Sequence, residues 1–285
     1  MPKPTAILLL TCPDQRGIVA AISSFVAENN GNVIALDQYV DAAEQVFFAR
    51  MEWELEGFSV PLDQFAARFD TVARPRRIDW SLRLSAERLR MAVMVSRQPH
   101  CLYDILARHE SGEWPVDLAL VLSNHPDHRG LVERHGIPFH LVPVTAADKA
   151  QTEPRQIQIL RDARIDFVVL ARYMQILSPD FVRAFPCRIV NIHHSFLPAF
   201  AGAKPYHAAH DRGVKIVGAT AHYVTENLDE GPIIEQDVIR VSHRQGVEDL
   251  VRLGRDLEKI VLSRAIYWHL THRLLVYKNR TVVFN

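Results

Sequence analysis

The stretch RIVNIHHSFLP, from Arg188 to Pro198, ends an apolar run in a burst of polar side chains. Four similar apolar runs come before it, separated by segments long enough for helices: MAVMVS, VDLALVLS, PFHLVPV and DFVVLA. Near-continuous apolar runs of this kind are typical of parallel strands that are buried on both faces and joined by helices. We therefore expect a doubly wound α/β sheet, with its chemistry where these strands end.

Two longer and more polar segments follow, KIVGATAHYVT and PIIEQDVIRV. Their pattern predicts an antiparallel pair of strands at the edge of the sheet. We expect a helix over 247–272 and a terminal hairpin, LLVYKNRTVVFN, to end the chain.

The first 84 residues have a different pattern. Apolar strands alternate there with two segments whose apolar residues are three and four apart, as on one face of a helix. The resulting order, βαββαβ, is typical of a ferredoxin-like sandwich. We expect this domain at 1–84, a short linker, SAERLR, at 85–90, and the larger sheet domain at 91–285.

The composition, 48% hydrophobic and 23% charged residues, is ordinary for a globular protein. The 33 basic residues balance the 33 acidic ones, which argues against a nucleic-acid or membrane-surface role, since these roles usually need a basic excess. No apolar run approaches the ~20 residues of a membrane span, and the N-terminus lacks a signal-peptide pattern. The three scattered cysteines indicate neither a disulfide framework nor a CxxC metal site. We predict a cytoplasmic protein.

The polar residues after the fifth apolar run allow several chemistries. Metal binding is disfavoured because adjacent His193 and His194 would point opposite ways on an extended segment. Ser195 lacks the Gly-x-Ser-x-Gly elbow of a hydrolase nucleophile. Asn191 and His193 would face one side, where an amide and an imidazole can stabilise an oxyanion. Alternatively, both residues cap the strand end and bind loop backbone, and the local sequence leaves this choice open.

A second polar cluster, TENLDEGPIIEQ, spans 225–236 and places three carboxylates before a Gly-Pro turn signal. One carboxylate could pair with an imidazole and position a water. The alternative is a solvated acidic turn, which we prefer for Glu226 and Glu230. A third stretch, FVVLARYMQILSP, ends a strand with apolar side chains that suit a flat heteroaromatic ligand, although a Tyr and a Met there are core residues by default.

Together these stretches resemble the folate-dependent formyltransferase family, which includes glycinamide ribonucleotide transformylase and methionyl-tRNA formyltransferase. The signature is Asn-x-His followed by Leu-Pro in NIHHSFLP, with an Asp in ENLDEGPII some 36 residues on, and the similarity covers about 90–285. The resemblance implies that Asn191, His193 and Asp229 are catalytic. It also implies that a pterin binds along the third stretch, and the residues expected to bind substrate are Leu170, Arg172, Tyr173, Met174, Gln175, Ile176, Leu177 and Lys204.

The first 84 residues resemble an ACT domain, a small-ligand regulatory module. TCPDQRGIVAAIS fits its first strand-to-helix turn, and NGNVIALDQ fits its second strand. The resemblance implies a small amino-acid effector at an interface between copies, and hence a homo-oligomer, a dimer or tetramer. ACT domains also persist as assembly modules without a ligand. The expected effector-binding residues are Asp14, Arg16, Gly17, Ile18 and Asn32.

The order of the two domains resembles the formyltetrahydrofolate deformylase family. This implies hydrolysis of 10-formyltetrahydrofolate to formate and tetrahydrofolate, which supplies formate and balances one-carbon pools for purine synthesis, without a metal or other cofactor. The alternative is formyl transfer to an amine acceptor such as glycinamide ribonucleotide.

The turn after the first strand of the larger domain bears on this choice. In the transformylase a Gly/Ser-rich turn cradles the phosphate of the acceptor, whereas RQPHCLYDIL contains no glycine. Water is therefore the expected nucleophile. A third interpretation, a folate or amino-acid sensor with a decayed catalytic domain, is disfavoured because Asn191, His193 and Asp229 are all present.

Overall fold

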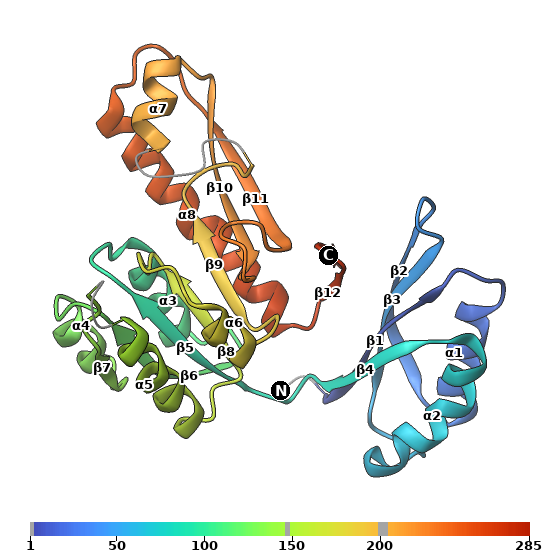
Figure 1. Ribbon diagram of the computed structural model, residues 1–285. Coiled ribbons are helices and arrows are strands. Elements are labelled where there is room, and N and C mark those ends of the chain that lie inside the picture. Colours follow the sequence, from blue (N-terminus) through green and yellow to red (C-terminus); the bar gives the residue numbers. More distant parts are fainter. Residues whose placement is uncertain (1–2, 146–148, 199–204) are drawn as a thin grey trace. The chain divides into compact units, whose positions relative to one another are not determined.

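The structure is a computed structural model that describes residues 3–145, 149–198 and 205–285, and it divides into two compact units (Figure 1). The first unit comprises the residues up to Glu87 together with Thr271–Leu275 and Val282–Asn285, and the second comprises Arg88–Leu270 and Val276–Thr281. The sequence did not predict the return of the C-terminal residues to the first unit, because 91–285 was expected to form one domain. The role of each unit as a functional domain stays a prediction.

The first unit is a four-stranded antiparallel sheet with two helices packed against it (Figure 1). Its strand order is β2-β3-β1-β4, and β1 pairs antiparallel with both β3 and β4. The prediction of a ferredoxin-like βαββαβ sandwich is confirmed. The elements are β1 (Thr5–Pro13), α1 (Ile18–Glu28), β2 (Asn32–Asp41), β3 (Val46–Glu54), α2 (Leu62–Arg76) and β4 (Asp79–Leu84).

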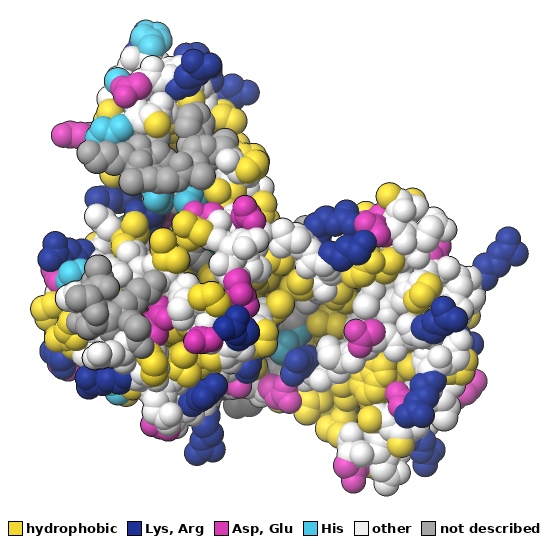
Figure 2. Space-filling model, in the orientation of Figure 1, with side chains coloured by type: hydrophobic (Ala, Val, Ile, Leu, Met, Phe, Trp, Pro, Cys, Tyr) yellow, Lys and Arg dark blue, Asp and Glu magenta, His cyan; other side chains and the backbone are white. Residues whose placement is uncertain are grey.

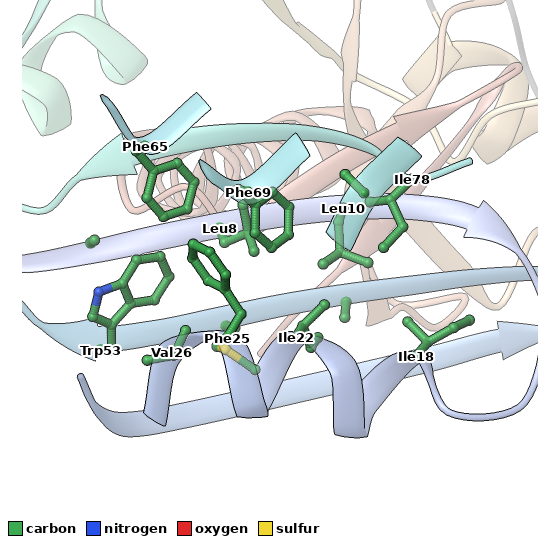
Figure 3. Close-up of a cluster of buried hydrophobic side chains, with 14 of the residues drawn as sticks. Leu8, Leu10, Ile18, Ile22, Phe25, Val26, Trp53, Phe65, Phe69 and Ile78 are labelled. Atoms are coloured by element: carbon green, nitrogen blue, oxygen red, sulfur yellow. The ribbon is translucent and has the colours of Figure 1, made fainter. Parts of the chain in front are cut away.

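The core of this unit lies between the sheet and the two helices (Figure 3). Residues four apart on α1, Ile18, Ile22 and Val26, are at most 2% exposed. From α2, Phe65 and Phe69 stack at 5.4 Å between ring centroids. Burying a side chain of this size contributes about 1.5–3 kcal/mol. The unit therefore has a hydrophobic core of its own.

The second unit is built on a seven-stranded sheet in the order β11-β10-β9-β8-β5-β6-β7. The strands from β9 to β7 in this order run parallel, whereas β10 pairs antiparallel with both β9 and β11. The predicted doubly wound sheet with an antiparallel edge pair is confirmed. The strands of this sheet are β5 (Leu89–Val95), β6 (Val116–Ser123), β7 (Phe139–Leu141), β8 (Phe167–Ala171), β9 (Ile189–His193), β10 (Ile216–Tyr223) and β11 (Ile233–Arg240). The helices are α3 (His100–Glu110), α4 (Arg129–Arg134), α5 (Lys149–Asp162), α6 (Pro179–Ala184), α7 (Pro205–Arg212) and α8 (Val247–Leu270). The chain then forms the terminal hairpin of β12 (Leu274–Tyr277) and β13 (Arg280–Val283).

Helices cover both faces of this sheet (Figure 1). On one face, Met94 of β5 and Leu170 of β8 belong to the same core cluster as Leu160 of α5 and Phe181 of α6. On the other face, α8 contacts α3, β9, β10 and β11. Because both faces are covered, the central strands are continuous apolar runs in the sequence and do not alternate.

Charged side chains of both signs are spread over the surface. Figure 2 shows acidic and basic side chains interspersed on the face that it draws, in keeping with the 33 residues of each sign. No described helix combines the length and the apolar character that crossing a lipid bilayer requires.

Candidate active site

A pocket of about 640 Å³ lies at the carboxyl ends of β8 and β9. Asn191 and His193 line it from β9. They share one side of the strand, as their spacing predicts, because alternate residues of a strand face the same way. His193 is only 7% exposed, so the pocket and not the open surface is its environment.

The prediction that His193 and His194 point opposite ways is wrong. Their ring centroids lie 5.1 Å apart, and both residues line the pocket. The reason is that β9 ends at His193, so the alternation of the strand does not extend to His194. Burial, the Arg172 guanidinium and His193 lower the pKa of His194 from 6.5 to about 4. This imidazole is therefore neutral at neutral pH.

Asp229 reaches the same place from the loop between β10 and β11. Gly231 allows this, since a Cβ there would lie 1.7 Å from the carbonyl oxygen of Tyr223. Asp229 has a positive φ of 57°, which Asp tolerates better than most residues. Its Oδ1 lies 3.3 Å from His193 Nδ1. The structure thus brings Asp229, His193 and Asn191 together, and their catalytic roles stay a prediction.

The two neighbouring carboxylates of this loop behave differently. Glu226 and Glu230 are exposed, as expected for a solvated turn. Glu226 pairs with Arg183 at 2.8 Å, and Glu230 accepts a hydrogen bond from Asn227 at 3.0 Å. Asp229 alone of the three carboxylates lies beside an imidazole.

The Asp229 carboxylate is held in its ionised form. The neighbouring imidazoles, His193 first and then His222, lower its pKa far below the ordinary value of 3.8 and outweigh the opposing effect of burial. The side chain is still 19% exposed. An ionised carboxylate that is paired on one side and accessible on the other can align a water and take up its proton.

His222 is a site residue that the sequence did not single out. It lies directly opposite Asn191 on the neighbouring strand β10, next to an irregularity in the pairing of β10 with β11. His222 Nδ1 donates to the Tyr223 carbonyl at 2.9 Å. Its Nε2 then accepts from Asn191 Nδ2 at 3.2 Å. His222 therefore fixes which end of the Asn191 amide faces the pocket, and only the strand register could have revealed this contact.

His193 keeps one ring nitrogen for a ligand. Its Nε2 is buried and has no hydrogen-bond partner among the described residues, while Nδ1 faces Asp229. A buried polar atom without a partner is costly and is therefore uncommon outside functional sites. When Asp229 binds the proton on Nδ1, an additional proton on Nε2 makes that atom a donor toward the pocket.

The loop expected to bind the pterin lines the pocket with all its predicted residues from Leu170 to Leu177. Ser96, at the end of β5, holds the loop by accepting a hydrogen bond from Met174 N at 3.0 Å. Met174 and Ile176 are 57% and 59% exposed, so their apolar side chains are available to a ligand.

Tyr173 and Lys204 differ from the other residues that were predicted to bind substrate. Tyr173 is 6% exposed and belongs to the hydrophobic core. Its hydroxyl accepts from Gln156 at 2.9 Å, and burial raises the pKa of Tyr173 to about 12. Its ring can form the floor of the pocket, but its hydroxyl is already engaged. Lys204 lies outside the described residues.

A second carboxylate, Glu258 of α8, lies in the wall of the same pocket and is 1% exposed. Burial on its own raises the pKa of Glu258, but the hydrogen bond from His100 and the charge of Arg172 lower it below the ordinary value of 4.5. Ligand atoms of His100, Cys101 and Glu258 lie within 4.8 Å of one another, as in a metal site. The nearby Arg172 cation and the raised pKa of the buried Cys101 thiol oppose metal binding there.

The residues expected to bind an effector lie around the turn between β1 and α1. Asp14 and Arg16 are exposed, and Gly17 has a φ of 84° immediately before α1. Ile18 is 2% exposed in the core (Figure 3), so its side chain is not available to an effector. Asn32, at the start of β2, donates to Glu54 at 2.9 Å. Effector binding stays a prediction.

Comparisons with known proteins agree with this geometry. The sequence profile of the formyl transferase family matches residues 89–266. A formyltetrahydrofolate deformylase of Synechocystis sp. is 52% identical over 280 residues, which cover 98% of this chain and 98% of the relative. The match therefore spans both units.

Solved structures give the same result. The crystal structure of a formyltetrahydrofolate deformylase from Pseudomonas syringae pv. tomato superposes with a TM-score of 0.97 at 47% identity and covers 100% of this chain and 96% of that one. A glycinamide ribonucleotide transformylase 1 from Symbiobacterium toebii is more distant, with a TM-score of 0.65 at 32% identity. It covers 70% of this chain and 95% of its own.

Proposed function

The chain belongs to the family of formyltetrahydrofolate deformylases, and on this premise we propose that it hydrolyses 10-formyltetrahydrofolate to formate and tetrahydrofolate. The observation that carries the proposal is the convergence of an amide, an imidazole and an ionised carboxylate in one pocket. They are Asn191, His193 and Asp229, and the last two lie 3.3 Å apart.

The substrate binds with its pterin against the loop that follows β8. Met174 and Ile176 offer exposed apolar side chains to the flat ring, and Leu228 offers a third from the Asp229 loop, with 60% of its surface exposed. Backbone groups at the strand end supply hydrogen bonds. The formyl group then lies beside Asn191.

Asp229 activates the nucleophile. Its carboxylate accepts one hydrogen bond from His193 Nδ1 and a second from a water, which it aims at the formyl carbon and partly deprotonates. The water adds to that carbon, and the carbonyl oxygen becomes an oxyanion. Because the pKa of Asp229 is far below its ordinary value, the carboxylate is a weak base. It takes the water's proton only transiently and releases it toward N10, and in its ionised form it stabilises positive charge on His193.

Asn191 and His193 stabilise the oxyanion. The Asn191 amide is oriented by its contact with His222, and a protonated His193 donates from the buried Nε2 that lacks a partner among the described residues. The tetrahedral intermediate then collapses: the C–N10 bond breaks, a proton reaches N10, and formate leaves. A preorganised donor of this kind contributes about 3 kcal/mol of transition-state stabilisation.

One assay separates hydrolysis from formyl transfer. The purified protein is incubated with 10-formyltetrahydrofolate, with and without glycinamide ribonucleotide. Hydrolysis yields equal amounts of formate and tetrahydrofolate in both reactions, whereas a transferase stalls without the acceptor. If no tetrahydrofolate appears in either reaction, the remaining interpretation is a folate or amino-acid sensor with an inactive site.

No metal ion or other cofactor takes part, since Asn191, His193 and Asp229 supply every group that the reaction uses. Turnover therefore survives dialysis against a chelator, and a loss that added zinc restores would overturn this point. The reaction supplies formate and balances the one-carbon pools that purine synthesis draws on. The protein works in the cytoplasm, which the free thiols of Cys12, Cys101 and Cys187 support.

The first unit acts as an ACT-type module that assembles copies of the chain and binds a small amino acid. The support for assembly is β2, an edge strand of its sheet with large hydrophobic side chains that are 37–51% exposed: Val33, Ile34, Leu36, Tyr39 and Val40. An edge strand of this kind pairs readily with another chain.

Light scattering tests the assembly, and calorimetric titration with a panel of amino acids tests the effector. The substitutions Ile34→Lys and Tyr39→Lys should reduce the dimer or tetramer to a smaller species. Tyr103→Lys is the matched control, because Tyr103 is 54% exposed on α3. A monomeric parent protein, or an absence of binding heat for every amino acid, would remove the corresponding part of the proposal.

A further inference from the structure

Four side chains from separate elements form a connected polar network in the pocket wall, which we call the Glu258 network. Glu258 Oε1 accepts from the Tyr206 hydroxyl at 2.8 Å, and Oε2 lies 2.7 Å from His100 Nε2. Arg172 Nε lies 3.5 Å from the same Oε2. All four residues line the pocket, and none is part of the Asn191–His193–Asp229 group.

The network begins one ring away from the candidate catalytic residues. The His194 ring lies 5.1 Å from that of His193 and 6.0 Å from that of Tyr206, measured between centroids. The sequence of contacts therefore runs from His193 through His194 and Tyr206 to Glu258. The network therefore lines the same pocket as Asn191, His193 and Asp229, and it adjoins them through the His194 ring.

A glycine on α8 makes room for the network. A Cβ at Gly254 would lie 2.0 Å from the Tyr206 hydroxyl oxygen, so the phenol lies directly on the helix one turn before Glu258. Tyr206 is consequently 8% exposed. An alanine at this position would displace the phenol from the carboxylate.

Arg172 occupies a position where a glycine would be unstrained. Its φ is 60°, in the left-handed region that costs a residue with a side chain of order 1 kcal/mol or more. Its guanidinium nevertheless lies inside the wall, with the side chain 13% exposed beside Glu258. The compensating contact is the charge of Glu258, which would otherwise be buried without a cation.

Glu258 is 1% exposed within the network, so its carboxylate is not accessible to a ligand. Each carboxylate oxygen already has a donor, and the adjacent Arg172 cation repels an ammonium group. A buried carboxylate in a pocket wall is otherwise a good partner for an amine. Here the same carboxylate holds the wall closed.

We propose that the Glu258 network restricts the reaction to water, because it fills and neutralises the side of the pocket through which an amine would reach the formyl carbon. The inference rests on the proposed hydrolysis, whose specificity it explains. In the excluded reaction the amine nitrogen bonds to the formyl carbon, the C–N10 bond breaks, and the proton lost by the amine passes to N10.

Arg172→Gly tests the proposal, since glycine adopts the backbone conformation of residue 172 without strain. The parent and the variant are incubated with 10-formyltetrahydrofolate and increasing glycinamide, and formate, tetrahydrofolate and N-formylglycinamide are measured. The parent forms one formate per tetrahydrofolate at every glycinamide concentration. The variant diverts a fraction to N-formylglycinamide that grows with glycinamide and lies roughly tenfold or more above the background of the parent reaction, the discrimination that a missing group in a pocket wall typically removes.

Arg164→Gly is the matched control. Arg164 also has a positive φ, 51°, and is exposed at the turn before β8. Arg164→Gly therefore makes the same Arg-to-Gly change away from the pocket. It should leave the ratio of formate to tetrahydrofolate at one. The proposal is overturned if Arg172→Gly hydrolyses its substrate with one formate per tetrahydrofolate at every glycinamide concentration, or if the parent transfers the formyl group. A parent that releases no formate in the absence of glycinamide counts against the proposed hydrolysis instead.

A binding measurement covers the case in which Arg172→Gly does not turn over. Saturation-transfer NMR of glycinamide is recorded with folate-loaded parent and folate-loaded variant. Transfer to glycinamide in the variant alone supports the closed wall. Equal transfer in both proteins, or in neither, contradicts it.

Discussion

Two carboxylates, Asp229 and Glu258, line the same pocket, and they differ in exposure and in hydrogen bonding. Asp229 is 19% exposed, and its imidazole contacts are loose, at 3.3 and 3.7 Å. Glu258 is 1% exposed, and its two hydrogen bonds are short, at 2.7 and 2.8 Å. The first carboxylate therefore keeps room for a water, whereas the second is buried and has a protein donor on each oxygen.

The backbone around each carboxylate explains the difference. Asp229 lies in a loop that Gly231 lets fold back onto β10, so its side chain reaches the pocket from outside the sheet. Glu258 lies in the middle of the long helix α8 and is surrounded by side chains from three other elements. One pocket thus contains a carboxylate to which we assign the reaction and a carboxylate that is part of the wall.

The largest expected effect comes from removing the charge of the reacting carboxylate. Asp229→Asn keeps the size of the side chain but neither aligns a water as a base nor stabilises charge on His193. Turnover is expected to fall by a hundredfold or more, about 3 kcal/mol in the transition state, with folate affinity nearly unchanged. Steady-state kinetics and folate titration check this.

The neighbouring carboxylate supplies the control for that variant. Glu230 is exposed and lies one residue along the same loop, so Glu230→Gln should leave turnover within a few-fold of the parent. Turnover of Asp229→Asn within a few-fold of the parent would show that Asp229 does not act in the reaction.

Replacing Glu258 should lower the free energy of unfolding. Glu258→Ala leaves the buried Arg172 cation and the Tyr206 hydroxyl without their partner, and breaking a buried charge pair costs about 3–5 kcal/mol. The free energy of unfolding, measured in urea, should fall by about that amount. Asp229→Asn should lower it much less.

An exposed carboxylate on the same helix is the matched control for this stability effect. Glu248→Gln, at the start of α8, should leave the unfolding free energy within about 0.5 kcal/mol of the parent. The contrast between the two carboxylates fails if Glu258→Ala is as stable as Glu248→Gln.

A smaller effect is expected from His222, which touches both Asn191 and the Asp229 side of the pocket. His222→Phe removes the acceptor that orients the Asn191 amide, and misplacing a catalytic group can cost on the order of tenfold to a hundredfold in rate. We expect kcat to fall while KM changes little. His222→Gln, which retains an acceptor, should recover part of the loss, and equal activity in the two variants would remove the positioning role.

The smallest effect concerns pH. The folded-state pKa values of His194 and His272 are lowered from 6.5 to about 4, in each case chiefly by burial. A lowered pKa means that the unfolded chain binds these protons first, so stability is fully present above about pH 6.5 and is lost as the pH falls toward 4. The carboxylates contribute to acid instability only below their ordinary values near 4.

Urea unfolding between pH 7 and pH 4.5 measures this loss, which should reach a few kcal/mol at most. His272→Asn removes one of the two groups and suits the φ of 52° at this position. Its stability should fall less steeply with decreasing pH. An identical slope in the parent and the variant would assign the acid instability to other groups.

Much of this molecule could be predicted from the sequence, for reasons visible in particular residues. Continuous apolar runs gave the parallel strands, and the two-residue spacing of Asn191 and His193 gave their shared side. The alternation rule failed at His194, because the strand ends one residue earlier. The Ile18 side chain lies in the core, as its helical spacing predicts, and effector binding at this residue stays a prediction.

The contacts that depend on register and on helix packing could not be predicted. His222 lies opposite Asn191 only because β10 pairs with β9 in one register. The Glu258 network joins residues up to 158 positions apart in the chain, and no local pattern relates them. The alternation of side chains along a strand can be predicted from the sequence. The neighbours of a residue on other strands and helices depend on how the fold packs.

An isotope measurement shows whether Asn191, His193 and Asp229 direct a water onto the formyl carbon. The protein is given 10-formyltetrahydrofolate alone in water enriched in oxygen-18, and the formate is analysed by mass spectrometry. We expect one solvent oxygen in every formate and one formate per tetrahydrofolate. Formate without the label, or no tetrahydrofolate until an amine is added, would show that water is not the nucleophile.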